Sequence, residues 1–582
     1  MIAANNPSEA FARVAVDELA RCGVTDAVLA PGSRSTALAI ALAEDPRIRL
    51  HVQIDERSAA FLAVGLARAS GVPAIVLTTS GTAAANLHPA VLEADAGLVP
   101  MLVVTADRPP ELRGTGANQT IDQIKLFGSA VRRFVEAGVP EDRPGVVGYW
   151  RSLWSRVFAE AVGTSAPPGP VHVNAAFREP TVPAVDDGRS RAAHPFEQPL
   201  DGRAGRRPWT TVERPARPAP TDHLEIMAGR MAGTERGLIV VGDTNAPAGP
   251  IHALSRATGW PVVAEPHSNV RFGDTVVAHA ALLLASTPFA EAHKPDFVVR
   301  VGRPTIARPV LELLGPDAPQ LLIDPFGHWS DPQRGLLDLL VADPGLVCTA
   351  LSDLLAVEAS SDWSDAWRTA DEAAASAVSE ALEGHARPIE PQMARDVHAA
   401  VPRGGAFVVA SSMPIRDVDA FASPRDGTRV VSNRGVSGID GFVSTTLGVA
   451  LAHDGPVVAL AGDLSMLHDR NGFLLSPEAD GIDATFVVID NDGGGIFHLM
   501  PPVDYPGTFE RVFGTPHGLD FEKIARTHGL GYTRLGAANE VDLAVRVAVD
   551  TGGIHLLHVR TDREVNAELH RRIQASVTAA IA

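Results

Sequence analysis

Two short polar stretches in the last third of the chain decide the fold: Gly462-Asp463-Leu464-Ser465 and Asp490-Asn491-Asp492-Gly493-Gly494-Gly495. Each follows an apolar run, Val457–Leu460 or Thr485–Ile489, whose composition predicts a buried strand. In a parallel sheet, ligand-binding residues gather where the strands end. We therefore expect the Asp463 carboxylate and the Asn491 amide to lie close together at one edge of such a sheet.

These residue types indicate a metal and diphosphate site. Mg²⁺ prefers hard oxygen ligands and usually completes its shell with phosphate oxygens of a bound molecule. The glycines that follow Asp492 let the backbone approach a diphosphate without an intervening Cβ atom. The alternative is an ordinary pair of strand-to-helix turns, in which Gly, Asp and Asn are common.

The composition is that of an ordinary globular protein, with 45% apolar and 20% charged residues. A chain of 582 residues is too long for one core, so we expect several domains. No apolar run reaches membrane-spanning length, the N-terminus lacks a leader pattern, and the two cysteines exclude a disulfide framework. A cytoplasmic enzyme fits best. The net charge of −19 argues against a nucleic-acid partner and makes any arginine cluster informative.

Three blocks alternate β-branched runs with helical stretches, which predicts α/β domains with parallel sheets. We assign them to residues 1–185, 221–357 and 358–582, with a Pro- and Arg-rich linker at 186–220. The middle block lacks a G-x-G-x-x-G motif after Val240-Val241-Gly242-Asp243, so we expect it to be structural. Helices are predicted at 58–69 and within 360–390. The predicted strands are 26–29, 74–78, 100–105, 171–174, 237–241, 261–264, 297–301, 320–323, 407–410, 429–431, 457–460, 485–489 and 555–559.

Glu56 is the candidate catalytic residue near the N-terminus. It follows a short strand and precedes the Ala-rich helix at 58–69. Alone, Asp55 and Glu56 would be explained as first-turn residues that the helix dipole favours. Together with the Asp463 and Asn491 motifs, Glu56 suits a carboxyl group that holds a proton in an apolar setting.

The two opening stretches resemble the metal and diphosphate motif of thiamin diphosphate (ThDP) enzymes, Gly-Asp-Gly followed by Asn-Asn. Leu464 replaces the second glycine and Asp490 the first asparagine, and Asp492 adds a further carboxylate. The two extra carboxylates either tighten Mg²⁺ binding, favour Mn²⁺, or point away from the ion.

Further segments resemble one ThDP family, the 2-succinyl-5-enolpyruvyl-6-hydroxy-3-cyclohexene-1-carboxylate (SEPHCHC) synthases of menaquinone biosynthesis. The resemblance covers both outer blocks well and the middle block weakly. It implies three parallel-sheet α/β domains of the ThDP enzyme type. The segments that carry it are 31–36, 54–57, 79–83, 106–112, 116–120, 432–435, 437–441 and 493–497.

The resemblance implies decarboxylation of 2-oxoglutarate and 1,4-addition of the succinyl carbanion equivalent to isochorismate. Both substrates are dianions, and arginine binds carboxylates bidentately without losing its charge. Five arginines are candidates for this role, namely Arg34, Arg108, Arg308, Arg416 and Arg434. Each lies near Gly, Pro or Ser, which indicates a loop rather than a mid-helix position. The resemblance also implies a homodimer or homotetramer whose active sites lie at the subunit interface.

The family resemblance assigns roles to individual residues. Glu56 would share a proton with the aminopyrimidine ring of ThDP, and Mg²⁺ or Mn²⁺ would be held by Asp463, Asn491 and the Gly493 carbonyl. Met500 would join Ile496 and Phe497 in an apolar wall, and Ile439 would hold the cofactor bent. The cofactor set is Ser80, Gly81, Thr82, Met413, Ser437, Gly438, Ile439, Gly462, Asp463, Leu464, Ser465, Asn491, Gly493, Ile496 and Phe497. The substrate set is Ser33, Arg34, Arg108, Asn118, Gln119, Arg308, Ser412, Arg416 and Arg434, with Arg303 as an alternative to Arg308.

Two alternatives stay open. Another ThDP-dependent 2-oxoacid decarboxylase or an acetolactate synthase-like enzyme would share Glu56 and the metal motif but would not need five arginines. A catalytically silent ThDP-fold scaffold would need no catalytic glutamate. The histidines form no cluster with metal-ligand spacing, and we assign them no role.

Overall fold

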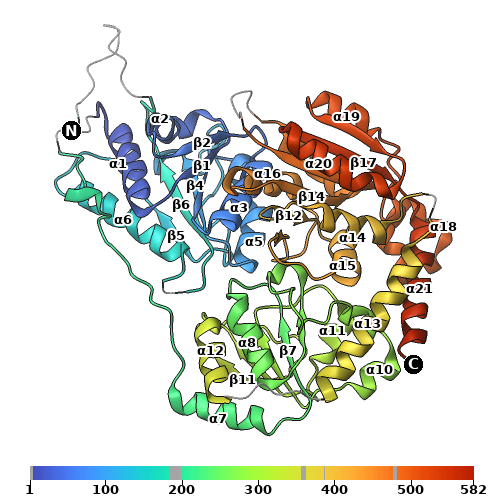
Figure 1. The fold of residues 1–582 in the computed structure, drawn as a ribbon. Coiled ribbons are helices and arrows are strands. Elements are labelled where there is room, and N and C mark those ends of the chain that lie inside the picture. The colour runs from blue at the N-terminus through green and yellow to red at the C-terminus, as the bar shows by residue number, and fades with distance from the viewer. Residues whose placement is uncertain are drawn as a thin grey trace. The chain divides into compact units, whose positions relative to one another are not determined.

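The structure is a computed structural model that describes residues 4–164, 166–182, 196, 198–355, 362–385, 387–475 and 481–582 (Figure 1). The chain forms two compact units. The first comprises Met1–Arg214, Gly435–Asp454 and Leu467–Ile482, and the second comprises Pro215–Arg434, Gly455–Met466 and Asp483–Ala582. Among the described residues, no helix is both long and apolar enough to span a membrane.

The first unit contains a six-stranded parallel sheet in the order β2-β1-β3-β4-β6-β5. Alternate strand residues share one apolar core with α1, α2 and α6, while α3 packs on β1 and β3. Helices that cover both faces explain why the central strands are continuous apolar runs. The elements are β1 Asp26–Leu29, β2 Arg49–Val52, β3 Ala74–Thr78, β4 Met101–Asp107, β5 Arg133–Glu136 and β6 Pro170–Ala176, with α1 Pro7–Cys22, α2 Thr36–Glu44, α3 Glu56–Ser70, α4 Thr82–Asn86, α5 His88–Ala96 and α6 Val146–Ala161.

The second unit contains a five-stranded parallel sheet in the order β11-β10-β9-β7-β8. Its helices include α13, which packs against the C-terminal helix α21. The elements are β7 Gly237–Val241, β8 Val262–Ala264, β9 Phe297–Val301, β10 Gln320–Ile323 and β11 Leu336–Leu340, with α7 Thr221–Ala232, α8 Ala248–Thr258, α9 Ala280–Leu284, α10 Thr287–Ala292, α11 Arg308–Leu313, α12 Pro344–Leu355 and α13 Asp362–Leu382.

The third sheet also lies in the second unit and has the order β13-β12-β14-β15-β17-β16, again all parallel. Its central strands β14 and β15 are the two that the opening motifs follow. The strands are β12 Ala406–Val409, β13 Arg429–Val431, β14 Val457–Gly462, β15 Ala484–Asp490, β16 Gly531–Leu535 and β17 Ile554–Arg560. The helices of this C-terminal part are α14 Glu390–Ala400, α15 Met413–Phe421, α17 Asp463–His468, α18 Pro506–Phe509, α19 Phe521–Thr527, α20 Val541–Thr551 and α21 Arg563–Ala580, whereas α16 Phe442–Ala452 belongs to the first unit.

The predicted three-sheet α/β class is confirmed, and every predicted strand is present within one or two residues at each end. Strand β2 was expected only as a short strand before Glu56, without bounds, and the strands that the pattern missed altogether are β5, β11 and β16, each at an edge of its sheet. They are partly exposed along most of their length, so their sequences contain no continuous apolar run. The exact domain boundaries stay a prediction.

The predicted linker and helical lead-in are partly described. Residues 186–195 and 197 of the linker, and residues 360, 361 and 386 of the lead-in, lie outside the described residues. Helix α13 lies within the lead-in. Within the linker, Trp209 donates its backbone N–H to Glu18 Oε1 at 2.5 Å, so this part of the segment is tied to the first unit.

Helices α3 and α16 make the closest helix contact in the first unit. Gly65 on α3 and Gly448 on α16 face each other, and a Cβ atom on Gly65 would collide with the Thr445 carbonyl oxygen. Small residues at such a crossing let two helix backbones approach closely. This contact explains why Gly435–Asp454, from the C-terminal block, belongs to the same compact unit as α3.

Gly65→Val should therefore destabilise the first unit, because the added side chain cannot be accommodated without separating α3 from α16. We expect a loss of about 1–3 kcal/mol, as for other overpacked cores, measured as a lower midpoint of thermal unfolding. The matched control is Gly229→Ala on α7, where an added Cβ meets nothing within 4 Å. A Gly65 variant as stable as the control would contradict the close contact.

Candidate active site

The two opening motifs meet at the carboxyl edge of the third sheet. Strands β14 and β15 pair in parallel, with Gly462 opposite Ile489. Asp463 directly follows β14 and is 2% exposed, and Asn491 directly follows β15. Gly493 donates its N–H to Asp463 Oδ2 at 2.8 Å, which joins the two turns. Gly493 has φ of 139° and no room for a Cβ atom beside the Gly514 carbonyl.

The Asn491 side chain is oriented for an oxygen ligand role. Its Nδ2 donates to Glu390 Oε1 at 2.9 Å, whereas its buried Oδ1 has no hydrogen-bond partner. A buried amide oxygen without a partner is costly and needs an explanation, such as an ion. Burial also raises the pKa of Asp463, because a lone buried carboxylate is disfavoured. The residues at this edge therefore fit a divalent cation bound by Asp463 and Asn491.

The structure shows where the two extra carboxylates point. Burial opposes ionisation of Asp490, but hydrogen bonds from His558 at 2.9 Å and Arg560 at 2.7 Å outweigh it and lower the pKa of Asp490 to about 2. Asp492 Oδ1 accepts the backbone N–H groups of His517 and Gly518, at 3.0 and 2.8 Å. Both carboxylates are therefore engaged with protein groups.

Sequence reasoning missed His517, which the Asp492 contact places beside Asp463. His517 Nδ1 accepts the Leu519 N–H at 3.0 Å, so in the neutral ring the proton lies on Nε2. That Nε2 lies 3.2 Å from Asp463 Oδ2 and can donate to it. Among the described His, Cys, Asp and Glu side chains, those of Asp463, Asp490 and His517 form a group close enough together to hold a metal ion. The tautomer makes His517 an orienting partner of Asp463 rather than a ligand.

The other predicted cofactor residues in the second unit surround this edge. Met413 begins α15, and Leu464 donates its N–H to Asp463 Oδ1 at 2.6 Å. Ile496 and Phe497 lie on a short 3₁₀ helix and are half-buried, and Met500 is 39% exposed. Such partly exposed apolar side chains are available to cover a bound ring.

In the first unit, Glu56 is the first residue of α3. Asp55 caps the helix by accepting the N–H groups of Arg57 and Ser58, at 2.9 and 3.3 Å, so the capping role falls to Asp55 and not to Glu56. The Glu56 carboxylate is half-buried, and its Oε2 lies 3.4 Å from Asn86 Nδ2. Its neighbour Ile54 is 67% exposed, which is unusual for a large apolar side chain beside a candidate catalytic residue.

Arg34 and Arg108 come together in the first unit. Both are at least nine-tenths buried, and burial followed by the charge of Arg34 lowers the pKa of Arg108. Arg108 donates to Ser80 Oγ, and Arg34 donates to the Phe177 carbonyl at 3.0 Å. Arg34 also pairs at 3.1 Å with Glu179, whose side chain is 71% exposed, so the two clustered cations are only partly compensated and suit an anionic ligand.

Backbone and amide contacts fix the loop beside these arginines. Gln119 Nε2 donates to the Ser80 carbonyl at 3.0 Å, and Gly81 donates its N–H to Gln123 Oε1 at 3.0 Å. The buried Gln123 was not predicted from the sequence, and it holds the Ser80–Gly81 turn. Ser33, Thr82 and Asn118 are exposed.

The substrate residues predicted in the second unit are only partly brought together. Arg434 is 2% exposed; its Nη2 donates to the Thr305 carbonyl at 2.7 Å and its Nη1 to Ser411 Oγ at 3.2 Å. Arg416 donates to the Ser412 carbonyl at 2.6 Å, and burial lowers its pKa. The expectation that Arg416 lies in a loop is wrong, because Pro414 sits in the first turn of α15 and supports the helix start.

Arg308 does not join this group. Its side chain is 89% exposed and pairs with Glu312 one helical turn away. Arg303, the alternative, donates from Nη2 to the Arg434 carbonyl at 2.8 Å. The ligand roles of Arg308 and Arg303 stay predictions.

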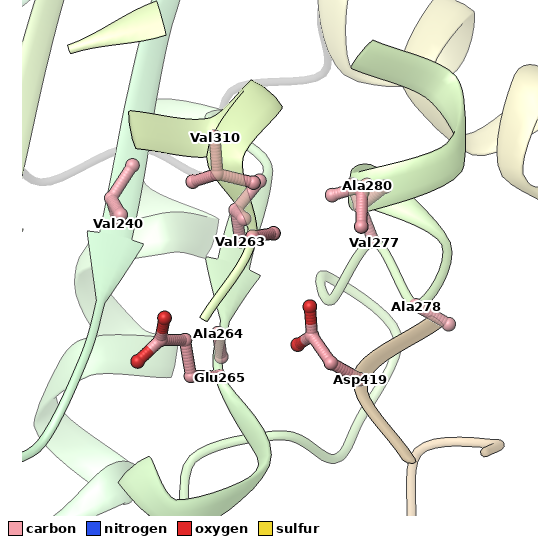
Figure 2. A pocket seen from close by; sticks show the side chains of 11 residues that line it. Val240, Val263, Ala264, Glu265, Val277, Ala278, Ala280, Val310 and Asp419 are labelled. Carbon is pink, nitrogen blue, oxygen red and sulfur yellow. The ribbon is translucent and has the colours of Figure 1, made fainter. Parts of the chain in front are cut away.

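The Thr305 turn that holds Arg434 is itself anchored by Glu265. Glu265 Oε1 accepts the N–H groups of Thr305 and Ile306, at 2.6 and 2.5 Å. Figure 2 shows the Glu265 and Asp419 carboxyl groups on opposite sides of a small cavity of about 10 Å³. Burial, followed by the charge of Asp419, raises the pKa of Glu265 to about 8, so this group is largely protonated at neutral pH.

Known proteins are similar to this chain both in single domains and over its whole length. Residues 10–126 match the model of the thiamine pyrophosphate enzyme N-terminal TPP binding domain, and residues 417–559 match that of the C-terminal TPP binding domain. A solved structure, benzoylformate decarboxylase from Polynucleobacter necessarius, has the same fold, with a TM-score of 0.72 at 17% identity over 95% of this chain and 99% of that one. The fold and the matched domains define a thiamine pyrophosphate enzyme that uses ThDP.

Whole-length relatives are more specific. The 2-succinyl-5-enolpyruvyl-6-hydroxy-3-cyclohexene-1-carboxylate synthase of Thermobifida fusca is 48% identical over 99% of this chain and 100% of its own. The synthase of the same name from Bacillus velezensis is 39% identical over 98% of each chain. The chain belongs to this synthase family.

Asn491→Ala should abolish most Mg²⁺-dependent ThDP binding, because it removes the partnerless buried oxygen that fits the cation. We expect at least about a tenfold loss of affinity, measured by titration calorimetry with ThDP and Mg²⁺. Asn566→Ala on α21 is the matched control, since Asn566 Oδ1 is also buried without a hydrogen-bond partner. Normal Mg²⁺-dependent affinity in the Asn491 variant would remove this residue from the metal site.

Proposed function

We propose that this protein is a SEPHCHC synthase: it decarboxylates 2-oxoglutarate and adds the remaining succinyl unit to isochorismate, giving SEPHCHC and CO₂ in menaquinone biosynthesis. Whole-length identity of 48% to a relative with that name supports the reaction. The observation in the structure that carries it is the buried pair Arg34 and Arg108 in a chain of net charge −19. Two dianionic substrates require such fixed positive charges.

In this proposal, separate groups of residues bind the cofactor, hold a proton and orient the substrate. ThDP, when bound, supplies the electron sink that makes decarboxylation and carbon–carbon bond formation possible. Asp463, Asn491 and the Gly493 carbonyl would hold Mg²⁺ or Mn²⁺, with the diphosphate beside the glycine turn. Glu56 would hold a proton at the aminopyrimidine ring, and Arg34 and Arg108 would orient a substrate carboxylate.

The proposal includes an oligomer, a dimer or a tetramer, in which Glu56 of one chain serves the Asp463 site of another. It is supported by exposed apolar side chains in the first unit that surround the predicted site residues in sequence. Ile54 is 67% exposed and Val436 57% exposed, next to the Glu56 and Ser437 motifs. Large apolar side chains at such exposure favour burial against a partner. The proposed location is the cytoplasm, which the use of only two cysteines favours.

An assay with ThDP, Mg²⁺, 2-oxoglutarate and isochorismate tests the reaction, with loss of isochorismate absorbance as the measurement. We expect loss only when all four components are present. Decarboxylation of 2-oxoglutarate without loss of isochorismate would leave a ThDP enzyme with another acceptor. Turnover of pyruvate in place of 2-oxoglutarate would favour the acetolactate synthase-like alternative.

Glu56→Gln serves as the internal control of this assay. The amide keeps the shape of the side chain but cannot exchange a proton with the cofactor ring, so turnover should be lost while ThDP still binds. Unchanged turnover in this variant would sink the catalytic assignment. Binding of ThDP without any reaction in the unaltered protein would instead support a silent scaffold.

Arg416→Met should weaken substrate use more than cofactor binding. Loss of a charged hydrogen bond costs about 1.5–3 kcal/mol, so kcat/KM should fall by about 10- to 150-fold. The exposed Arg368→Met on α13 is the matched control and should change kcat/KM by less than about twofold, as expected for an exposed ion pair. Equal losses in ThDP affinity and in kcat/KM would take Arg416 off the substrate set.

A further inference from the structure

Glu93 on α5 is a buried carboxylate that none of the roles above uses. It is 2% exposed, and its two oxygens accept the backbone N–H groups of Gly435 and Val436, each at 2.8 Å. Arg68 Nη2 donates to Glu93 Oε1 at 3.0 Å. All of these residues belong to the first unit. One carboxylate therefore fixes two successive peptide groups of a loop more than 300 positions away in the sequence.

This contact requires glycine at two positions, Gly435 and Gly97, because a side chain at either one would collide with it. A Cβ atom on Gly435 would lie 2.9 Å from the Glu93 carboxyl carbon and would also collide with the Glu93 carbonyl oxygen. A Cβ atom on Gly97 would lie 2.5 Å from Arg68 Nη2. Any larger residue at either position would displace the Arg68–Glu93 pair. The pair and its two glycines therefore form one specific arrangement.

The loop that Glu93 fixes leads directly into the predicted cofactor residues Ser437, Gly438 and Ile439. Ser437 has a φ of 62°, a backbone conformation that costs free energy in a residue other than glycine. Such a conformation persists only when its surroundings hold it. The two hydrogen bonds at Gly435 and Val436 supply that hold immediately before Ser437.

Arg68 connects the same contact to helix α3. Glu56 is the first residue of α3, and Arg68 lies in its last turn. The helix packs along α16, which begins at Phe442 after the cofactor loop. The helix that carries the candidate catalytic glutamate at one end therefore contributes, at its other end, to holding the loop of Ser437 and Ile439.

We propose that Glu93 is a positioning residue for ThDP: it holds the Gly435–Ile439 loop in the shape that binds the cofactor, and Arg68 fixes Glu93 in turn. The inference rests on the proposed cofactor role of Ser437, Gly438 and Ile439. A purely structural role would lower stability alone. A positioning role would also change the protection of the loop from deuterium exchange and the affinity for ThDP.

The test compares full-length Glu93→Gln with the unaltered protein. The amide has one acceptor oxygen instead of two and turns an N–H group toward a donor, so at least one loop N–H loses its partner. Deuterium exchange without cofactor should become faster in the peptide that covers 434–441. The Kd for ThDP at saturating Mg²⁺ should rise by at least about tenfold, as expected for a buried charged contact. The kcat at saturating ThDP should change by less than about threefold.

Two further variants make the result specific. Arg68→Met leaves the carboxylate on the loop but removes its ion-pair partner, so it should give a smaller change of the same kind, and it substitutes for Glu93→Gln if that variant does not fold. Glu160→Gln on α6 is the matched control, because Glu160 is a buried carboxylate paired at 2.9 Å with Arg133 of strand β5. It should leave exchange at 434–441 and the Kd for ThDP unchanged.

The outcomes separate this inference from the proposed function. Unchanged exchange at 434–441 and unchanged ThDP affinity in Glu93→Gln would overturn the positioning role, and so would equal effects in Glu160→Gln. Faster exchange with unchanged affinity would also overturn it, because the loop would then be held without consequence for the cofactor. If the unaltered protein bound no ThDP, the proposed function would fail on its own.

Discussion

The parallel pairing of β14 with β15 is the constraint on which the candidate site depends. It places the turn after each strand at the same edge, so that the Gly493 N–H reaches Asp463 Oδ2 at 2.8 Å. The strands are buried on both faces, which makes their ends insensitive to surface changes. Neighbouring hydrogen bonds orient the side chains at the two turns: Glu390 orients the Asn491 amide, and Asp492 positions His517.

An acidic chain that acts on the proposed acidic substrates has to concentrate its positive charge. The buried arginines do this in two ways. Arg34 and Arg108 lie together without a full set of acidic partners, so burial and mutual repulsion lower the pKa of Arg108. Arg151, also buried, is instead neutralised by Asp17 and Glu18, at 2.8 and 2.7 Å. By contrast, the Glu179 side chain that pairs with Arg34 is 71% exposed, which supports the proposed role of Arg34 in binding an anion.

The sequence was sufficient to predict the central strands and the residues that follow them, because buried parallel strands are apolar runs with turn residues at their ends. It was not sufficient for β5, β11 and β16, whose exposed positions break the apolar run. It also misplaced Arg416, because neighbouring Ser and Pro residues were interpreted as a loop when Pro414 supports a helix start. Glu93 and His517 were missed for another reason. Each acts through a contact with a residue distant in sequence, and no local pattern indicates such a partner.

The carboxyl groups around β14 and β15 support the proposed cation site at this edge. Asp490 pairs with Arg560 and accepts a hydrogen bond from His558, and Asp492 accepts backbone N–H groups. Burial raises the pKa of both Asp463 and Glu390, that of Glu390 to about 7. A proton and a divalent cation therefore compete for the same buried negative charge. Lowering the pH favours the proton, because a carboxylate must be ionised to bind the metal. A cation would also satisfy the partnerless Oδ1 of Asn491, which a proton on Asp463 does not.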